Sequence, residues 1–173
     1  MKRQTLAFSG VAIIFLAFGG YLGLKRLQIE KPADAVVAKL FAGSLPDASG
    51  KQQTMSQWRG KTLVINFWAT WCGPCVQEMP ELSVLQSEVA SKDIQLIGVG
   101  IDSASNIQAF SSKYKISYPL FVAGLSGTEL SRQFGNEAGG LPFTVLVGAD
   151  GQIRKRYLGR LKMSELRADI EGK

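Results

Sequence analysis

The segment Trp71-Cys72-Gly73-Pro74-Cys75 constrains this chain more than any other, because it holds the only two cysteines among the 173 residues. It follows an apolar run, Thr62–Trp68, that is typical of a strand covered on both faces. After it, apolar residues recur at three- and four-residue spacing and predict a helix over residues 74–90 with one face toward a core: Met79, Leu82, Leu85 and Val89. The cysteines are therefore expected where a buried strand gives way to a helix.

This position suits reversible thiol chemistry. Free backbone N–H groups and the positive end of the helix dipole stabilise a thiolate, which lowers the pKa of a cysteine from about 8.5. Pro74 loses no hydrogen bond in the first helical turn and fixes φ there. We expect Cys72 to attack a client disulfide and Cys75, one turn inward, to resolve the mixed disulfide. A purely structural disulfide is the weaker interpretation, since so small a loop hardly constrains the unfolded chain.

Composition argues against several other kinds of site. The chain has no histidine and only two cysteines, so it lacks the ligands of a structural zinc site and the base of Cys-His catalysis. Val76 follows Cys75, where covalent haem attachment needs a histidine. The 20 Lys and Arg residues outnumber the 14 Asp and Glu residues but are scattered, which argues against a nucleic-acid partner. We expect neither a metal nor a cofactor.

The N-terminal residues predict a membrane anchor. No charged residue occurs from Leu6 to Leu24, and 19 residues of helix span about 28 Å, close to the ~30 Å hydrocarbon core of a bilayer. We expect residues 1–5 in the cytoplasm, residues 6–24 as a single pass through a bacterial inner membrane, and residues 25–40 as a linker. A cleaved signal peptide, ending near Ala17-Phe18-Gly19, is the alternative.

Charge does not decide the orientation of this segment. Two basic residues precede it and two follow it, so the positive-inside rule gives a near tie: Lys2, Arg3, Lys25 and Arg26. Anchored or cleaved, the remainder of the chain is expected outside the cytoplasm.

Residues 41–173 are expected to form one globular domain. Turn residues around Pro46-Asp47 and Ser49-Gly50 predict a short N-terminal hairpin. A strand, a helix and a second strand in succession imply a parallel βαβ unit, whereas the turn pair Asp150-Gly151 joins antiparallel strands. Further strands are expected at residues 94–101, 118–122, 143–147 and 153–158. Further helices are expected at residues 104–114 and 127–134, and a last helix is expected to begin at Ser164, with Ser164 as its N-cap.

Residues 66–80, NFWATWCGPCVQEMP, resemble the signature of the thioredoxin superfamily, and more narrowly of the membrane-anchored TlpA/ResA-like thiol-disulfide oxidoreductases. The resemblance covers roughly residues 41–170. It implies a thioredoxin-like α/β fold, with helices flanking a central mixed sheet, an N-terminal hairpin and a central insert. It also implies that Pro80 kinks the active-site helix, that Pro142 is the family's cis-proline beside the disulfide, and that the backbone of Leu141 pairs with a substrate strand.

The resemblance also implies a proton carrier. Cytoplasmic thioredoxins have a buried Asp six residues before the first cysteine, where this chain has Asn66, which cannot relay a proton. In the TlpA/ResA-like branch a Glu three residues after the second cysteine serves near the sulfurs, and Glu78 occupies that position, on the same helix face as Cys75. We expect Glu78 to act as acid and base for the resolving thiol, with its pKa raised by burial and by the thiolate. A solvated helix carboxylate is the alternative.

Three tryptophans are expected to differ in role. Trp68 and Trp71 bracket the motif and should wall the active site, with Trp71 as the surface contact for a partner. Trp58 is expected to be a packing residue of the N-terminal hairpin.

The resemblance implies a periplasmic reductase of protein disulfides, kept reduced by a membrane electron donor of the CcdA/DsbD type. Gly73-Pro74 favours this direction, because strongly oxidising relatives usually carry His between the cysteines. The clients compatible with the resemblance are apocytochrome c during cytochrome c maturation, oxidase assembly factors at a copper site, and other oxidised envelope proteins, and no residue of the sequence chooses among them.

Two other functions stay open. A peroxiredoxin-like thiol peroxidase is suggested by the extra elements around residues 115–135 and by Thr70, two residues before Cys72. A Sco-like copper-carrying module would share the fold and the anchor, but it expects Cys-x-x-x-Cys and a His ligand, and this chain has neither.

Overall fold

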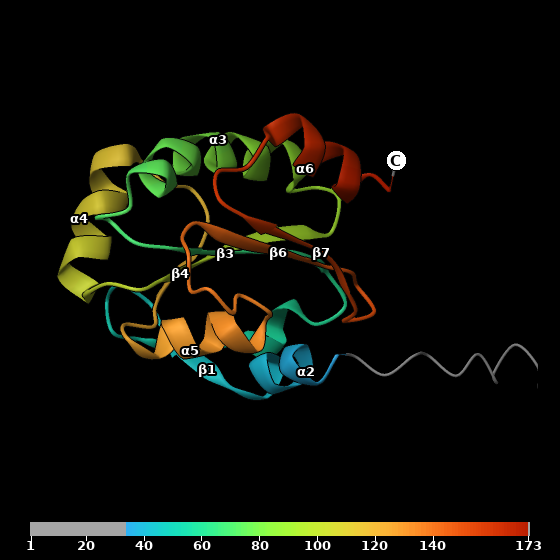
Figure 1. The fold of residues 1–173 in the computed structure, drawn as a ribbon, viewed down its shortest axis with the longest axis horizontal. Helices are drawn as coiled ribbons and strands as arrows, with labels where there is room; N and C mark the ends of the chain where they lie inside the picture. Colours follow the sequence, from blue (N-terminus) through green and yellow to red (C-terminus); the bar gives the residue numbers. More distant parts are fainter. Residues whose placement is uncertain (1–33, 173) are drawn as a thin grey trace, which may run out of the picture. The chain divides into compact units, whose positions relative to one another are not determined.

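The computed structural model describes residues 34–172 (Figure 1). The predicted cytoplasmic N-terminus, the predicted anchor at residues 6–24 and the first part of the predicted linker lie outside the described residues. Within residues 34–172, no helix is both long enough and apolar enough to cross a membrane.

A mixed five-stranded sheet forms the centre of the domain. Its strands lie in the order β5-β4-β3-β6-β7, with β3, β4 and β5 parallel and with β6 and β7 antiparallel to their neighbours. The strands are β3 (Thr62–Trp68), β4 (Ile94–Gly100), β5 (Leu120–Val122), β6 (Phe143–Val147) and β7 (Ile153–Leu158). The central strands β3 and β6 are almost wholly buried, as their apolar runs predict, because helices cover both faces of the sheet.

Two layers of helices enclose the sheet, with a hydrophobic core on each side (Figure 1). On one face lie α3 (Gly73–Val89), α4 (Ala104–Tyr114) and α6 (Met163–Ile170), which contribute Leu82, Ile107 and Leu166 to one core. On the other face lie α2 (Ala35–Ala42) and α5 (Ser126–Gln133). The fold is the predicted thioredoxin-like α/β architecture, and β5 with α5 occupies the predicted insert.

The predicted N-terminal hairpin is present. β1 (Ser44–Pro46) pairs antiparallel with β2 (Gln52–Thr54), and a 3-10 helix, η1 (Met55–Trp58), follows. Trp58 is buried and meets Phe121 edge-on, with ring centroids 5.5 Å apart, so it is a packing residue as expected.

The predicted boundary of the folded domain at Phe41 is wrong, because α2 begins inside the predicted linker. Val37 and Leu40 of α2 are buried in the second core. Asp34, just before α2, accepts the backbone N–H of Ile153 through its carboxylate at 2.7 Å. Residues 34–40 therefore belong to the domain, held by contacts with a strand 119 residues further along the chain.

The predicted N-cap of the last helix is also wrong. α6 begins at Met163, with Lys162 as N-cap and no side-chain capping bond, and Ser164 lies inside the helix. The carbonyl of Lys162 accepts the N–H groups of Glu165 and Leu166, at 3.0 and 3.1 Å. Backbone hydrogen bonds to Lys162 therefore begin the helix one residue before Ser164, although serine is a preferred N-cap residue.

Candidate active site

The two cysteines lie between the end of β3 and the first turn of α3, and they form a disulfide. Cys72 is the N-cap of α3, and its Sγ accepts the backbone N–H of Cys75 at 3.3 Å. A sulfur in this position faces the free amides and the positive dipole end of the helix, which is the environment that stabilises a thiolate. Cys75 is completely buried, whereas Cys72 keeps a small exposed edge between the exposed residues Trp71 and Gly73.

Both prolines of the helix lie where the sequence places them. Pro74 is in the first turn of α3, where its missing N–H breaks no hydrogen bond. Pro80 lies inside α3. It supplies no N–H to the carbonyl of Val76, four residues earlier in the first turn.

The peptide bond between Leu141 and Pro142 is cis, as the resemblance implies. Pro142 precedes β6, and the pairing of Phe143 with Phe67 brings this loop beside the end of β3, just before the cysteines. The carbonyl of Gly140 accepts the side-chain amide of Asn136 at 2.9 Å, and the carbonyl of Pro142 accepts the N–H of Gly159 at 2.8 Å. The loop is therefore held on both sides of Leu141, whose pairing with a substrate strand stays a prediction.

Glu78 is a fully buried carboxyl, so the alternative of a solvated helix carboxylate is wrong. Oε1 accepts the side-chain amide of Asn66 at 2.8 Å, and Oε2 accepts the backbone N–H of Leu161 at 2.9 Å. Burial raises the pKa of Glu78 to about 7, although these two hydrogen bonds and the charge of Arg160 oppose the rise. A carboxyl with this pKa can both accept and donate a proton near neutral pH.

Asn66 holds the carboxyl of Glu78 and does not carry a proton itself. Its side-chain amide donates to Glu78 and also to the hydroxyl of Thr144 on β6, at 2.9 Å. Asn66 therefore fixes the carboxyl of Glu78 against the sheet.

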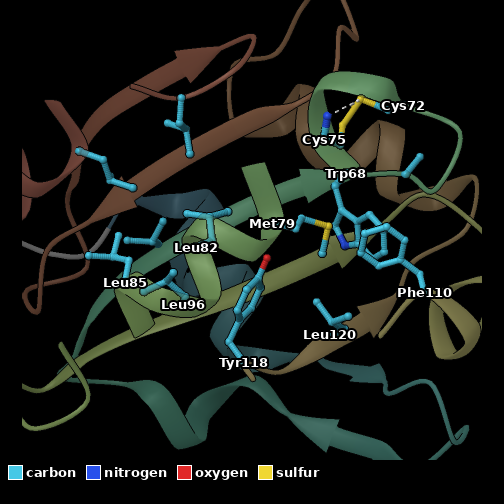
Figure 2. Close-up of a cluster of buried hydrophobic side chains, with 14 of the residues drawn as sticks. Trp68, Cys72, Cys75, Met79, Leu82, Leu85, Leu96, Phe110, Tyr118 and Leu120 are labelled. Atoms are coloured by element: carbon cyan, nitrogen blue, oxygen red, sulfur yellow. Dashed lines mark hydrogen bonds between the residues drawn. A yellow bond between two sulfur atoms is a disulfide. The ribbon is translucent and has the colours of Figure 1, made fainter. Parts of the chain in front are cut away.

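The two tryptophans beside the motif have different surroundings. Trp68 is completely buried, with its ring 4.8 Å from that of Phe110 (Figure 2). It belongs to the same core as both cysteines, so it backs the site from inside and offers no surface to a partner. Trp71 is 70% exposed and is the apolar surface beside Cys72, as predicted.

Asp102 is a residue of this site that the sequence reasoning missed. It follows β4, and its carboxylate accepts both the backbone N–H and the hydroxyl of Thr70, in the loop that leads to Cys72. Burial opposes ionisation of Asp102, but hydrogen bonds from Thr70, Asn106 and Ser103 together lower its pKa. An acidic residue directly after a buried strand is the sequence signal that could have indicated it. Thr70, which suggested a thiol peroxidase, is engaged here by Asp102.

Metal ligands are not gathered in the part of the chain that the structure describes. Within residues 34–172, no three His, Cys, Asp or Glu side chains are placed to hold a metal ion together.

Comparison with models of protein families shows to which family the chain belongs. The family model described as Redoxin matches residues 32–170, which is most of the chain. The chain belongs to the Redoxin family. This match includes α2, in agreement with the domain boundary that the structure shows.

Curated relatives are similar over nearly their whole length. Thiol-disulfide oxidoreductase ResA of Geobacillus thermodenitrificans is 26% identical over 172 residues, covering 98% of this chain and 97% of the relative. The thioredoxin-like protein YneN of Bacillus subtilis is 28% identical over 180 residues, with 99% of each chain covered. A crystal structure of a thioredoxin-related protein from Neisseria meningitidis serogroup B matches with a TM-score of 0.66 at 27% identity, over 73% of this chain and 96% of that one.

These findings confirm the predicted kinship. The chain is a TlpA/ResA-like member of the thioredoxin superfamily and, as an enzyme, a protein-disulfide oxidoreductase.

Proposed function

We propose that this enzyme reduces disulfides of other proteins through Cys72 and Cys75. The observation that carries the proposal is the placement of Cys72 Sγ at the N-terminus of α3, in contact with the N–H of Cys75. This placement favours the thiolate of Cys72, and the thiolate is the species that attacks a disulfide.

The proposed reaction has two exchange steps. In the first, the Cys72 thiolate attacks one sulfur of the client disulfide, and the other client sulfur leaves as a thiolate. In the second, Cys75 loses its proton and its thiolate attacks Cys72 Sγ, which forms the Cys72–Cys75 disulfide and releases the second client thiolate. The client gains two electrons and the enzyme loses two, and a dithiol donor then returns them by the same exchange in reverse.

We assign the proton of Cys75 to Glu78. Cys75 is buried, so bulk water does not readily accept its proton. Glu78 lies on the same face of α3, one turn further on, and its raised pKa of about 7 lets the carboxylate take up a proton near neutral pH. The hydrogen bonds from Asn66 and Leu161 hold the carboxyl in place for this transfer.

Trapping of the mixed disulfide tests the mechanism. A Cys75→Ser variant keeps the attacking thiol but cannot resolve, so cells producing it should accumulate client proteins bound to Cys72 that dithiothreitol releases. The matched Cys72→Ser variant retains only the buried thiol and should trap far less. Equal trapping by both variants, or none by either, would contradict the assigned roles.

The cellular setting is part of the proposal. Residues 6–24 would anchor the enzyme in a bacterial inner membrane, with residues 34–172 in the periplasm. A membrane protein of the CcdA/DsbD type would return the electrons, and apocytochrome c or oxidase assembly factors would be the clients. The uncharged segment and the similarity to ResA support this setting.

Protease treatment of spheroplasts tests the location. The catalytic domain should be digested from outside in intact spheroplasts, while a cytoplasmic marker protein survives. Protection of the domain until the membrane is broken would contradict a periplasmic location. For the direction of electron flow, a redox potential of the purified protein close to that of a strong oxidant such as DsbA, about −120 mV, would contradict the reductase assignment.

A further inference from the structure

Two buried polar atoms near Glu78 lack a hydrogen-bond partner among the protein atoms. They are the hydroxyl oxygen of Tyr118 and the side-chain oxygen of Asn66. Tyr118 is 4% exposed and Asn66 is 1% exposed, so bulk water does not reach either group. Leaving such a group unpaired in a protein interior destabilises the fold. Native proteins commonly satisfy such groups with an ordered internal water.

These two atoms lie on the same side of the sheet, under α3. Asn66 on β3 is paired in register with Gly98 on β4. Tyr118, just before β5, lies across Gly98, with its Cε2 3.3 Å from the point where a Cβ of Gly98 would stand. Its hydroxyl points toward α3, in the direction of Met79 and Leu82 (Figure 2).

Glu78 links the two groups. Asn66 donates its amide hydrogen to Glu78, and the charge of Glu78 acts on Tyr118, which burial already keeps protonated by raising its pKa. Because neither Tyr118 Oη nor Asn66 Oδ1 has a partner, they are not bonded to each other. One water molecule that accepts from the hydroxyl and donates to the amide oxygen would satisfy both atoms.

We propose that Tyr118 Oη and Asn66 Oδ1 are the two ends of a binding site for an internal water molecule beside Glu78. The water accepts the hydroxyl hydrogen of Tyr118 and donates to Asn66 Oδ1, and the amide of Asn66 donates to Glu78 Oε1. Trp68 Nε1 is a third unpartnered polar atom nearby and the second donor, 3.1 Å from the point where a Cβ of Gly98 would stand, and it can donate to the same water. These hydrogen bonds rest on the role proposed for Glu78 as proton carrier, and they make Tyr118 a positioning residue for its carboxyl.

The proposed hydrogen bonds from Tyr118 through the water and Asn66 to Glu78 all run in one direction, and this direction has a measurable effect. Every donor among them points toward Glu78, and hydrogen bonds arranged in this way polarise one another and favour the ionised carboxylate. The other charged groups that act on Glu78 are Arg160 and Glu81, which are of opposite sign, and neither takes part in these hydrogen bonds. Removing the hydroxyl of Tyr118 should therefore raise the pKa of Glu78 further, by about 0.5, which is about a threefold change in its ionisation equilibrium.

Carbon-13 NMR of the glutamate carboxyls in the oxidised full-length protein measures this directly. In that form the two cysteines do not titrate, so the titration of Glu78 is not coupled to a thiol. We expect an upward shift of the Glu78 pKa in Tyr118→Phe and none in Tyr114→Phe, which removes the hydroxyl of a half-exposed tyrosine on α4. An unchanged titration of Glu78 in a folded Tyr118→Phe variant would overturn the proposal.

A crystal structure of the oxidised full-length protein tests the site without any substitution. Electron density for a water within hydrogen-bond distance of both Tyr118 Oη and Asn66 Oδ1 is the expected result, and well-ordered side chains with no water between them would equally overturn the proposal. Both measurements use the disulfide form without a client. Their failure would leave thiol exchange by Cys72 standing, so it is distinguishable from failure of the proposed function.

Discussion

Replacement of Glu78 by glutamine should change how the stability of the oxidised protein depends on pH. The pKa of Glu78 is about 7 in the folded state, against an ordinary value of 4.5. A carboxyl with a raised folded pKa favours the folded state while it is protonated, so its contribution is fully present below pH 4.5 and is lost as the pH rises to about 7. The difference corresponds to about 3 kcal/mol.

Denaturant unfolding of the oxidised protein at pH 4.5 and pH 8 gives the assay. The glutamine side chain carries no ionisable group, so the free energy of unfolding of Glu78→Gln relative to the parent should rise by about 3 kcal/mol between these pH values. A constant offset is also expected, because an amide cannot accept from both Asn66 and Leu161. The change with pH is therefore the quantity that carries the test, and the offset is not.

Glu81→Gln is the matched control. Glu81 lies three residues further along α3, is half exposed and pairs with Arg160 at 2.9 Å. Loss of such a surface pair should cost less than about 1 kcal/mol. Parallel pH curves for Glu78→Gln and the parent protein would refute the reasoning, because they would mean that the carboxyl ionises equally well in the folded and unfolded states.

Three further substitutions separate recognition, loop positioning and packing. Trp71→Ala should slow exchange with protein clients but not with dithiothreitol, and should change stability by less than about 0.5 kcal/mol, since the side chain is 70% exposed. Equal slowing with protein clients and with dithiothreitol would contradict a contact role. Asp102→Asn, which weakens the acceptor for two donors of Thr70, should lower unfolding free energy by about 1–3 kcal/mol and slow exchange by Cys72, measured by denaturation and by stopped-flow fluorescence. Gly98→Ala should destabilise by about 1–3 kcal/mol, because its Cβ would stand 2.4 Å from Leu120 Cδ2, and an unchanged melting temperature would show that Leu120 moves aside freely.

Local patterns in the sequence predict most of the sheet and the position of the cysteines. A continuous apolar run has few alternatives to a strand covered on both faces, and β3 and β6 follow the predicted bounds. The Cys72–Cys75 pair is predicted with equal success, because a strand end, a turn and a helix N-terminus depend only on neighbouring residues.

Features that depend on distant residues could not be predicted in the same way. Asp34 is held by the backbone of Ile153, and Thr70 by Asp102, and in neither case do the residues between them indicate the contact. The start of α6 is a further case, since Ser164 lies inside the helix although serine is a preferred N-cap residue.

Glu78 shows how a sequence signal can be present and yet be recognised only through a family resemblance. On α3 the buried positions are Cys75, Glu78, Met79, Leu82, Leu85 and Val89, so the carboxyl belongs to the stripe that faces the core. A charged side chain at a helix position that faces the core disagrees with the apolar side chains around it, and such disagreements are expected at functional sites. Above pH 7 ionisation of this buried carboxyl costs the folded protein about 3 kcal/mol, a pH-dependent cost that glutamine at the same position would not carry. Packing therefore gives no reason for a carboxylate on α3 one turn beyond Cys75, whereas the proposed transfer of the proton of the buried Cys75 thiol does.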